Sequence, residues 1–354
     1  NPGQTAQITA LARLPRPAPD GPAVVAATAS GLVVALDAVG KRLWEHQARG
    51  PVLALAVGDV DSDGRAEVVA GGSPAWLLCL NDRGEARWEH RPAAYRAIPG
   101  DVVTLAIGDL EGDGRPDIIA GLKCWKYIAV NADGSEKWDT VIYAHSASAC
   151  TLADVDGNGK RCVLAGNVYY QLNLLGPEGK VRWQSYRFGP EHTAAAAADL
   201  NDDGKEEILA GSDLGEFHAL DGNARRLWAV NAGDAVRAIL VYRPKKGAPA
   251  EAYAAGESGF VYAVTADGKL RWKKPLGDAI FGAVLCDVDG DGHSEIVAAA
   301  GSAGVAVLRR DGTLARRLNT EAPALHVQVL EGTTPYIVAA LGNGRVAAWR
   351  IPAR

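Results

Sequence analysis

The chain has 354 residues, of which 48% are hydrophobic and 22% charged, so it can bury a large core and is neither disordered nor fibrous. Its formal charge of -5 leaves no general basic field for holding nucleic acid, and no stretch approaches the roughly 20 apolar residues of a transmembrane helix. We therefore predict a globular protein with no nucleic-acid partner and no membrane span.

Acidic loops recur along the chain with a period of about 45 residues. Their first aspartates stand at positions 59, 109, 154 and 199, and then at 287, two periods further on. A tryptophan follows each of the first four aspartates by 29 residues. The remaining repeats are degenerate, because the first has lost its acids before Trp44 and the sixth has Arg243 and Lys245 at acid positions before Trp272. The seventh has Arg316 in place of the tryptophan, and an eighth begins near Ala324.

Each repeat contains four short apolar or alternating segments separated by Gly, Asn and Asp turns, which is typical of a propeller blade. We predict an all-β fold with a single domain, an eight-bladed β-propeller of four-stranded blades. The last blade ends before an outer strand, so either the closing blade is three-stranded or the chain was cut from a longer one, and the open edge could pair with an assembly partner. The expected blades cover approximately residues 6–46, 51–90, 101–140, 148–185, 192–230, 235–274, 280–318 and 324–351.

The recurring aromatic residue is most simply a packing residue between blades, with its indole N–H paired. It is present as Trp44, Trp88, Trp138, Trp183, Trp228 and Trp272. The five cysteines show no zinc or disulfide spacing, so we expect free thiols. Cys150 and Cys162 flank one loop, but the hairpin register places them too far apart for a disulfide.

The segments GDVDSDGRAEVVAGG, GDLEGDGRPDIIAG and CDVDGDGHSEIVAAAG resemble the calcium-binding FG-GAP repeats of integrin α-chain propellers. The blade ends GLVVALDAVGKRLW and GFVYAVTADGKLRW are similar to PQQ-like propeller repeats, although no recognisable quinone-site residues accompany them. The resemblance implies calcium ligands at loop positions 1, 3, 5, 7 and 9, with position 7 acting through its backbone carbonyl. These ligands would be Asp59, Asp61, Asp63, Arg65 and Glu67; Asp109, Glu111, Asp113, Arg115 and Asp117; Asp154, Asp156, Asn158 and Lys160; Asp199, Asn201, Asp203, Lys205 and Glu207; and Asp287, Asp289, Asp291, His293 and Glu295.

Calcium takes six to eight oxygen ligands, and carboxylates at alternate positions of a tight turn converge on one point. We expect four to five Ca²⁺ sites, with the fourth-blade site weakened by Cys162 at position 9 and none in the sixth blade. The alternatives are metal-free hairpins whose aspartates form Asx-turns, and magnesium, which demands stricter geometry. A stabilising role is favoured over a catalytic one.

The connections on the opposite face of blades two to five combine aromatic and cationic residues, which suit a carbohydrate or protein ligand. The candidate ligand-binding residues are Tyr95, Arg96, Lys123, Trp125, Lys126 and Tyr169. The same face offers base and cation types for a polysaccharide lyase acting on uronate-containing glycans, namely Tyr143, His145, Tyr186, Arg187 and His192. Ordinary surface residues are the alternative.

The favoured function is a binding or scaffold module for carbohydrate or protein, stabilised by calcium. Loops of this kind suit compartments with millimolar calcium, so we expect a secreted or periplasmic protein. The two alternatives are the lyase and a structural subunit of a larger extracellular assembly.

Overall fold

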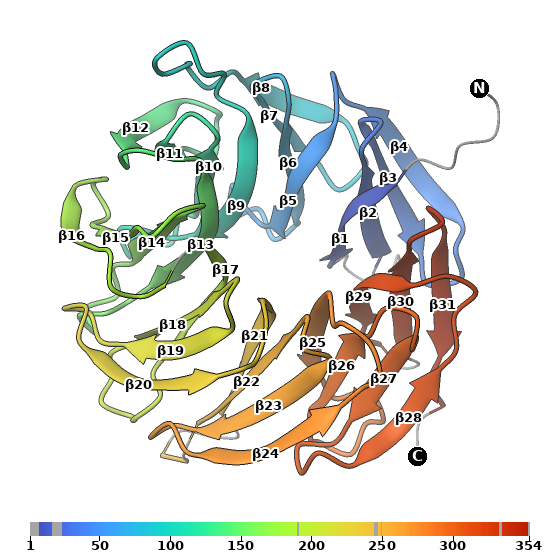
Figure 1. Ribbon diagram of the computed structural model, residues 1–354. Coiled ribbons are helices and arrows are strands. Elements are labelled where there is room, and N and C mark those ends of the chain that lie inside the picture. The colour runs from blue at the N-terminus through green and yellow to red at the C-terminus, as the bar shows by residue number, and fades with distance from the viewer. Residues whose placement is uncertain are drawn as a thin grey trace.

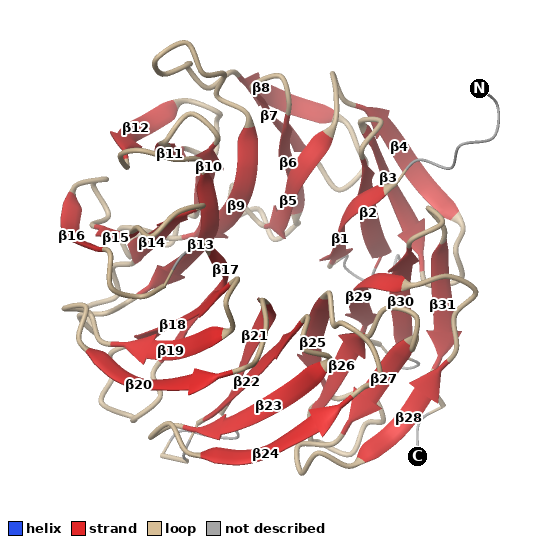
Figure 2. Ribbon diagram, in the orientation of Figure 1, coloured by secondary structure: helices blue, strands red, loops and turns tan. Residues whose placement is uncertain are grey.

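The computed structural model describes residues 7–15, 23–189, 191–243, 247–248, 250–332 and 335–352. These residues form 31 strands and no helix, arranged as eight antiparallel sheets around a central axis (Figures 1 and 2). Seven sheets have four strands and the last has three. The predicted eight-bladed propeller, with a closing blade that lacks its outer strand, is therefore confirmed. No helix among the described residues could cross a membrane.

The strands of each blade follow one another from the axis to the rim. Blades one to four consist of β1 (Ile8–Leu14), β2 (Ala23–Thr28), β3 (Leu32–Asp37) and β4 (Arg42–Gln47); β5 (Val52–Gly58), β6 (Glu67–Gly72), β7 (Trp76–Leu80) and β8 (Ala86–His90); β9 (Val102–Gly108), β10 (Asp117–Leu122), β11 (Lys126–Val130) and β12 (Glu136–Val141); and β13 (Ala147–Ala153), β14 (Cys162–Asn167), β15 (Leu172–Leu175) and β16 (Val181–Ser185).

The remaining blades repeat this arrangement. Blades five to eight consist of β17 (His192–Ala198), β18 (Glu207–Ser212), β19 (Glu216–Leu220) and β20 (Arg226–Asn231); β21 (Val236–Tyr242), β22 (Glu251–Gly256), β23 (Phe260–Thr265) and β24 (Leu270–Pro275); β25 (Gly282–Cys286), β26 (Glu295–Ala299), β27 (Val305–Leu308) and β28 (Leu314–Leu318); and β29 (Ala324–Leu330), β30 (Tyr336–Leu341) and β31 (Val346–Arg350).

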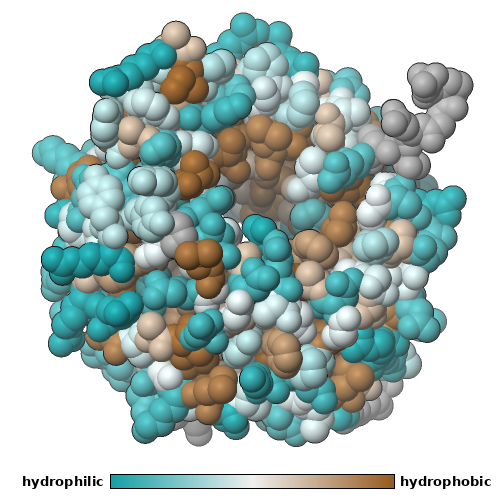
Figure 3. All heavy atoms as spheres, viewed as in Figure 1, coloured by the Kyte–Doolittle hydropathy of each residue, from teal (hydrophilic) through white to brown (hydrophobic). Residues whose placement is uncertain are grey.

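Burial changes across each blade in the way the strand sequences predict. Second strands such as β6 are buried along their whole length, because both of their faces pack against neighbouring blades. Fourth strands such as β8 are largely exposed, and their alternating sequence leaves one residue in two turned to solvent. The face drawn in Figure 3 is hollowed at its centre, and hydrophobic residues gather around the hollow.

The recurring tryptophans join consecutive blades as the sequence predicts. Each indole Nε1 donates a hydrogen bond to a backbone carbonyl in the turn between the third and fourth strands of the next blade. These bonds, of 2.7–2.9 Å, are Trp44 to Asp82, Trp88 to Ala132, Trp138 to Pro177, Trp183 to Gly222, Trp228 to Ala266 and Trp272 to Arg310. A glycine lies beneath most of the rings; a Cβ at Gly84 would stand 2.6 Å from the Trp44 ring.

The ring closes between blades eight and one through side chains. Gln328 donates to the Leu11 carbonyl over 3.2 Å, and Arg13 forms an ion pair with Glu331. The five cysteines are free, as expected. Cys162 pairs with Ala153 in the ladder, three residues along from Cys150, which explains why these two thiols do not join.

Candidate functional site

Two features could bind ligands, and the first is the set of acidic loops between first and second strands, at residues 59–67, 109–117, 154–162, 199–207 and 287–295. In each loop the first aspartate accepts a hydrogen bond from the N–H of the glycine at position 6. These bonds, of 2.6–3.0 Å, are Gly64 to Asp59, Gly114 to Asp109, Gly159 to Asp154, Gly204 to Asp199 and Gly292 to Asp287. The loops therefore share one backbone conformation, as the repeated sequence predicts.

The remaining loop positions are also fixed by hydrogen bonds. The position 7 N–H donates to the position 5 side chain over 2.8–2.9 Å in Arg65, Arg115, Lys160, Lys205 and His293. At position 9 a carboxylate oxygen of Glu67, Glu207 and Glu295 accepts the position 2 N–H. Burial raises the pKa of these three glutamates, so each ionised carboxylate lacks full compensation from the protein.

The donor atoms of two loops converge closely enough for one ion. In blade two Asp59, Asp61 and Glu67 each offer a carboxylate oxygen, and these oxygens lie within 4.8 Å of one another. Asp287, Asp289 and Asp291 do the same in blade seven. Calcium binds oxygen ligands at 2.3–2.6 Å, which corresponds to oxygen separations of this size. The residues therefore fit calcium.

Neighbouring cations distinguish the loops from one another. In blades two to four the residue before the tryptophan is Arg87, Lys137 or Arg182, and it contacts loop positions 3 and 9. Arg87 bonds Asp61 and Glu67, Lys137 bonds Glu111 (2.8 Å) and Asp117 (2.9 Å), and Arg182 bonds Asp156 (2.7 Å) and the Cys162 sulfur (3.1 Å). Blades five and seven have the uncharged residues Leu227 and Ala315 at this position.

The loop of blade five instead receives a cation from blade six. Arg243 lies 3.3 Å from Asp199 and 2.7 Å from Asp202. Lys245, the other cation that the sequence placed in this loop, lies outside the described residues. Adjacent loops also touch, because Arg161 donates to the Leu110 carbonyl and Glu206 to the Asp154 carbonyl, over 3.0 and 2.9 Å. The acidic loops of blades three, four and five are thus joined to one another by backbone hydrogen bonds.

The second feature is a group of side chains on the opposite face, which we call the aromatic platform: Tyr95, Arg96, Trp125, Lys126 and Tyr143. Three of its rings pack edge to face, with Trp125 lying 6.0 Å from Tyr95 and 5.6 Å from Tyr143 between centroids. The exposed Arg96 guanidinium lies 5.4–5.7 Å from the centroids of all three rings. A side-chain hydrogen bond with Tyr95 raises the pKa of Arg96.

The platform is built from three connections and a strand end. Tyr95 and Arg96 come from the β8–β9 connection, Trp125 from the β10–β11 turn, and Tyr143 from the β12–β13 connection. The Tyr95 and Ile98 backbones bond each other, which folds the first connection back on itself. Lys126 is buried beneath Tyr95, at 5.7 Å from its centroid, and bonds Asp139 over 2.5 Å.

The other predicted residues on this face fall into three groups. His145 and Tyr169 form a second aromatic cluster with Tyr170, which the sequence analysis did not single out, and successive ring centroids lie 4.7 Å apart. Lys123, Tyr186 and Arg187 are exposed on their own connections. His192 is fully buried in blade five, where its Nε2 bonds the Phe188 carbonyl over 3.1 Å.

His192 therefore does not present its ring to a ligand on this face. Its position at the start of a first strand matches Val52, Val102 and Val236, which are all fully buried, so aligning the repeats would have predicted this. Asp139, which forms an ion pair with Lys126, was not predicted from the sequence. The signal for Asp139 was weak, because it is one of several polar residues in an exposed strand.

Comparisons with known proteins agree with this architecture. Three similar solved structures are Sqt1 of Saccharomyces cerevisiae (TM-score 0.80, 11% identity, covering 99% of this chain and 97% of that chain), BamB from Moraxella catarrhalis (0.65, 18%, 98% and 97%) and the V. cholerae biofilm matrix protein Bap1 (0.69, 15%, 95% and 85%). At these identities the likeness shows the fold alone. No curated protein matches the chain.

A family model gives a more specific assignment. The model of the lambda-carrageenase beta-propeller domain matches residues 23–121 and 253–343, together just over half of the chain. The first segment contains the acidic loops of blades two and three, and also Tyr95 and Arg96. The chain belongs to the family of the lambda-carrageenase beta-propeller domain.

Proposed function

We propose that the chain is an exported, calcium-stabilised propeller that binds an anionic polysaccharide on its aromatic platform. The observation that carries the proposal is the position of Arg96, whose exposed guanidinium lies within 5.7 Å of three ring centroids. Aromatic faces stack on sugar rings, and a guanidinium pairs through two hydrogen bonds with a carboxylate or sulfate group. The family name, which refers to a carrageenase, supports a carbohydrate ligand.

The shape of the platform favours a polymer over a small molecule. Its rings come from loops on a rigid scaffold, and Tyr143 and the nearby Tyr169 are about half exposed, at 57% and 51%. Tyr143 and His145 share the β12–β13 connection, and Tyr169 lies in the β14–β15 turn of the blade that follows it, so the two aromatic clusters offer successive subsites to an extended chain. Tyr, Trp and Arg are also enriched in protein interfaces, which makes a protein partner the competing outcome.

A second candidate function, a lyase acting on uronate-containing glycans, is favoured by one observation. The Tyr143 ring lies 5.4 Å from Arg96, which places a possible base beside a cation. Measuring the absorbance of unsaturated products in the polysaccharide binding mixtures separates the two functions, because a lyase produces them. A binding module produces none.

We further propose that calcium occupies the acidic loops and has a structural role. The support is the convergence of three carboxylates in blades two and seven, and the raised pKa of the buried glutamates at position 9. An ion held there would neutralise carboxylates that otherwise repel one another. Millimolar extracellular calcium would fill such sites, which is why we propose an exported location.

The test is binding of the chain to sulfated, uronate-containing and neutral polysaccharides, measured by calorimetry. We expect binding to the anionic polymers, weakened about five- to thirty-fold by Trp125→Ala or Arg96→Ala, because each removes about 1–2 kcal/mol of stacking or ion pairing. Arg83→Ala is the matched control, since it removes one exposed cation from the opposite face. Unchanged affinity in Trp125→Ala would show that the ligand binds elsewhere, and loss of a product signal in Tyr143→Phe would favour the lyase.

A further inference from the structure

The contact that a tryptophan makes with the next blade is missing on both sides of blade eight, because blade seven has Arg316 at the tryptophan position and blade eight has no fourth strand among the described residues. The third-to-fourth turns of blades two, three and four are covered by Trp44, Trp88 and Trp138, and those of blades six and seven by Trp228 and Trp272. A Cβ on the turn glycine would lie within 2.4–2.9 Å of the indole in each case. A Cβ added at Gly40, in the equivalent turn of blade one, would have no atom of the described residues within 4 Å.

The turn of blade one nevertheless has the same conformation as the others. Gly40 has a φ of 86° and donates to the Asp37 carbonyl over 3.0 Å, just as Gly84 has a φ of 79° and donates to Asn81. The exposed residue before the glycine differs. It is Val39, which is 74% exposed, whereas the residues at this place in blades two to seven are polar: Arg83, Asp133, Glu178, Asn223, Asp267 and Asp311.

The third strand of blade one is also less covered than its counterparts in blades two to seven. Val34 and Leu36 are only partly buried. The residues in register with them in blades two to seven are all buried, namely Leu78, Ile128, Asn173, His218, Tyr262 and Ala306 for Val34, and Leu80, Val130, Leu175, Leu220, Val264 and Leu308 for Leu36. The difference arises because blade eight places only three strands against blade one.

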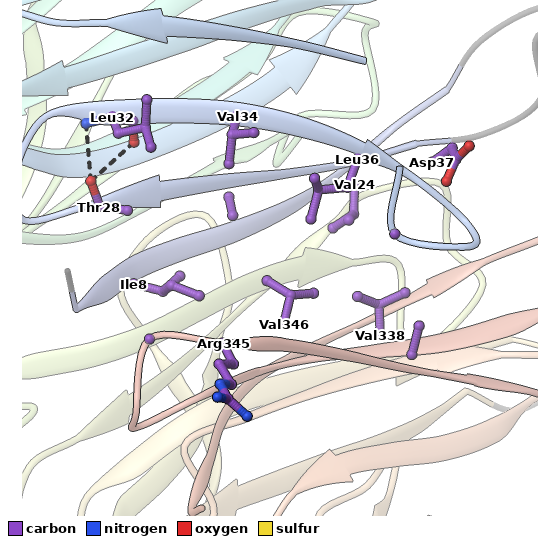
Figure 4. A pocket seen from close by; sticks show the side chains of 14 residues that line it. Ile8, Val24, Thr28, Leu32, Val34, Leu36, Asp37, Val338, Arg345 and Val346 are labelled. Atoms are coloured by element: carbon purple, nitrogen blue, oxygen red, sulfur yellow. Dashed lines mark hydrogen bonds between the residues drawn. The ribbon is translucent and has the colours of Figure 1, made fainter. Parts of the chain in front are cut away.

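These uncovered residues line an apolar groove of about 420 Å³ between blades eight and one. Figure 4 shows Val24 and Leu36 of blade one facing Val338 and Val346 of blade eight across this groove. Beside it runs β31, which pairs with β30 and with no other described strand. An apolar groove beside a free strand edge is the arrangement that accepts an added strand.

The two described residues that follow β31 do not turn back along this edge. In the other blades the third strand leads into a turn such as NDRG or TADG, whereas the corresponding residues here begin with Ile351 and Pro352. Ile351 is buried, donates to the Pro335 carbonyl over 2.9 Å, and packs with residues of blade seven. The described residues therefore leave this edge of β31 unpaired.

We propose that this groove binds an extended segment of another polypeptide chain, which adds to β31 as an antiparallel fourth strand and inserts a tryptophan between blades eight and one. The repeat defines the contact in detail. Each indole donates to the carbonyl two residues before the turn glycine, so the acceptor here is the Ala38 carbonyl. The ring would cover Gly40, Val34 and Leu36.

The test uses a labelled, end-blocked peptide of residues 40–47, GKRLWEHQ, the segment with which blade one covers blade two. Fluorescence anisotropy should show saturable binding to the whole chain, at least about tenfold weaker for the peptide with Trp44→Ala, because a tryptophan in a groove is a typical hot spot. Val34→Trp in the protein fills the groove and should abolish binding. Val181→Trp, which adds the same bulk to an exposed residue of blade four, should leave binding unchanged.

Either equal binding of the two peptides or no saturable binding would overturn the proposal. Binding that appears only after residues 1–6 are removed would also overturn it, because the chain's own N-terminal residues would then fill the groove. The peptide pair needs only the wild-type protein, so it decides the matter even if Val34→Trp does not fold. Hydrogen exchange gives a second readout, since bound peptide should protect the outward-facing amides of β31.

Discussion

Two buried histidines make the stability of blade five depend on pH. His192 and His218 are both fully buried, with ring centroids 6.0 Å apart. Nδ1 of His192 and both ring nitrogens of His218 have no hydrogen-bond partner among the described residues. Burial lowers the pKa of His192 to about 4 and that of His218 to about 3. Both rings are therefore neutral in the folded protein throughout the mildly acidic range.

The sign of the effect follows from the unfolded chain, in which imidazole titrates near pH 6.5. Between about pH 6.5 and pH 4 the unfolded chain binds up to two more protons than the folded protein, so folding stability falls as the pH falls. Each histidine contributes up to about 1.4 kcal/mol per pH unit in this window, which gives a loss of about 4 kcal/mol for the pair between pH 7 and pH 5. Burial also lowers the pKa of His326, which acts in the same direction.

Urea unfolding at several pH values measures this loss directly. His218→Leu is the matched variant, because Leu78 occupies the corresponding buried position in blade two. This variant should lose about half of the pH dependence that the pair contributes and should gain stability relative to the wild type near pH 5. A free energy of unfolding that is flat between pH 7 and pH 5, or an unchanged slope in His218→Leu, would refute the reasoning.

Three further predictions concern the turns and the acidic loops. Gly84→Ala should destabilise the protein by about 1–3 kcal/mol more than Gly40→Ala in urea unfolding. Both glycines have a positive φ, but of these two only Gly84 faces an indole. Equal losses of stability would contradict the missing tryptophan contact at Gly40. Chelation of divalent ions should lower the melting temperature and calcium should restore it, with about 2.7 kcal/mol per site at a hundredfold excess over the dissociation constant. Arg87→Leu should raise the calcium affinity of the blade-two loop, because it removes the cation that contacts Asp61 and Glu67. Calorimetry measures this affinity, and an unchanged value would show that Arg87 does not compete with the ion.

The repeated features of this protein could be predicted from its sequence because each copy supports the others. Trp88 and Trp138 stand at the same place in a 45-residue period, so their role as blade contacts and the pairing of their N–H groups followed from the alignment. The eight blades and the missing outer strand followed from the same period. Repetition turns a weak local signal into a strong one, because only a few architectures can use the same residue in every copy.

The features that occur once could not be predicted in this way. The sequence placed Arg96, Trp125 and Tyr143 on one face, but it could not show that the guanidinium lies among the rings, because three separate connections bring them together. It also suggested His192 as a base, since a histidine near exposed loops looks like a surface residue until its register in the strand is known. The partners of Lys126 and of Arg243 depend on how neighbouring segments pack, and no period marks them.

Backbone conformation gives an independent reason to assign function to the platform. Seven described residues other than glycine have a positive φ, and three of them are Arg96, Ala97 and Trp125, with φ of 49°, 61° and 67°. A bulky residue in this region costs about 1–3 kcal/mol and persists only where the surrounding structure enforces it. Ser62, Asp202 and Ala224 stand in tight turns of the repeat, and Trp125 stands at a turn position whose counterparts Ala75, Gly215 and Gly259 also have a positive φ, of 44°, 81° and 74°. A bulky indole thus occupies a position that other blades fill with glycine or alanine, so the strain at Trp125 and Arg96 falls on the proposed platform, which supports the binding role proposed for it.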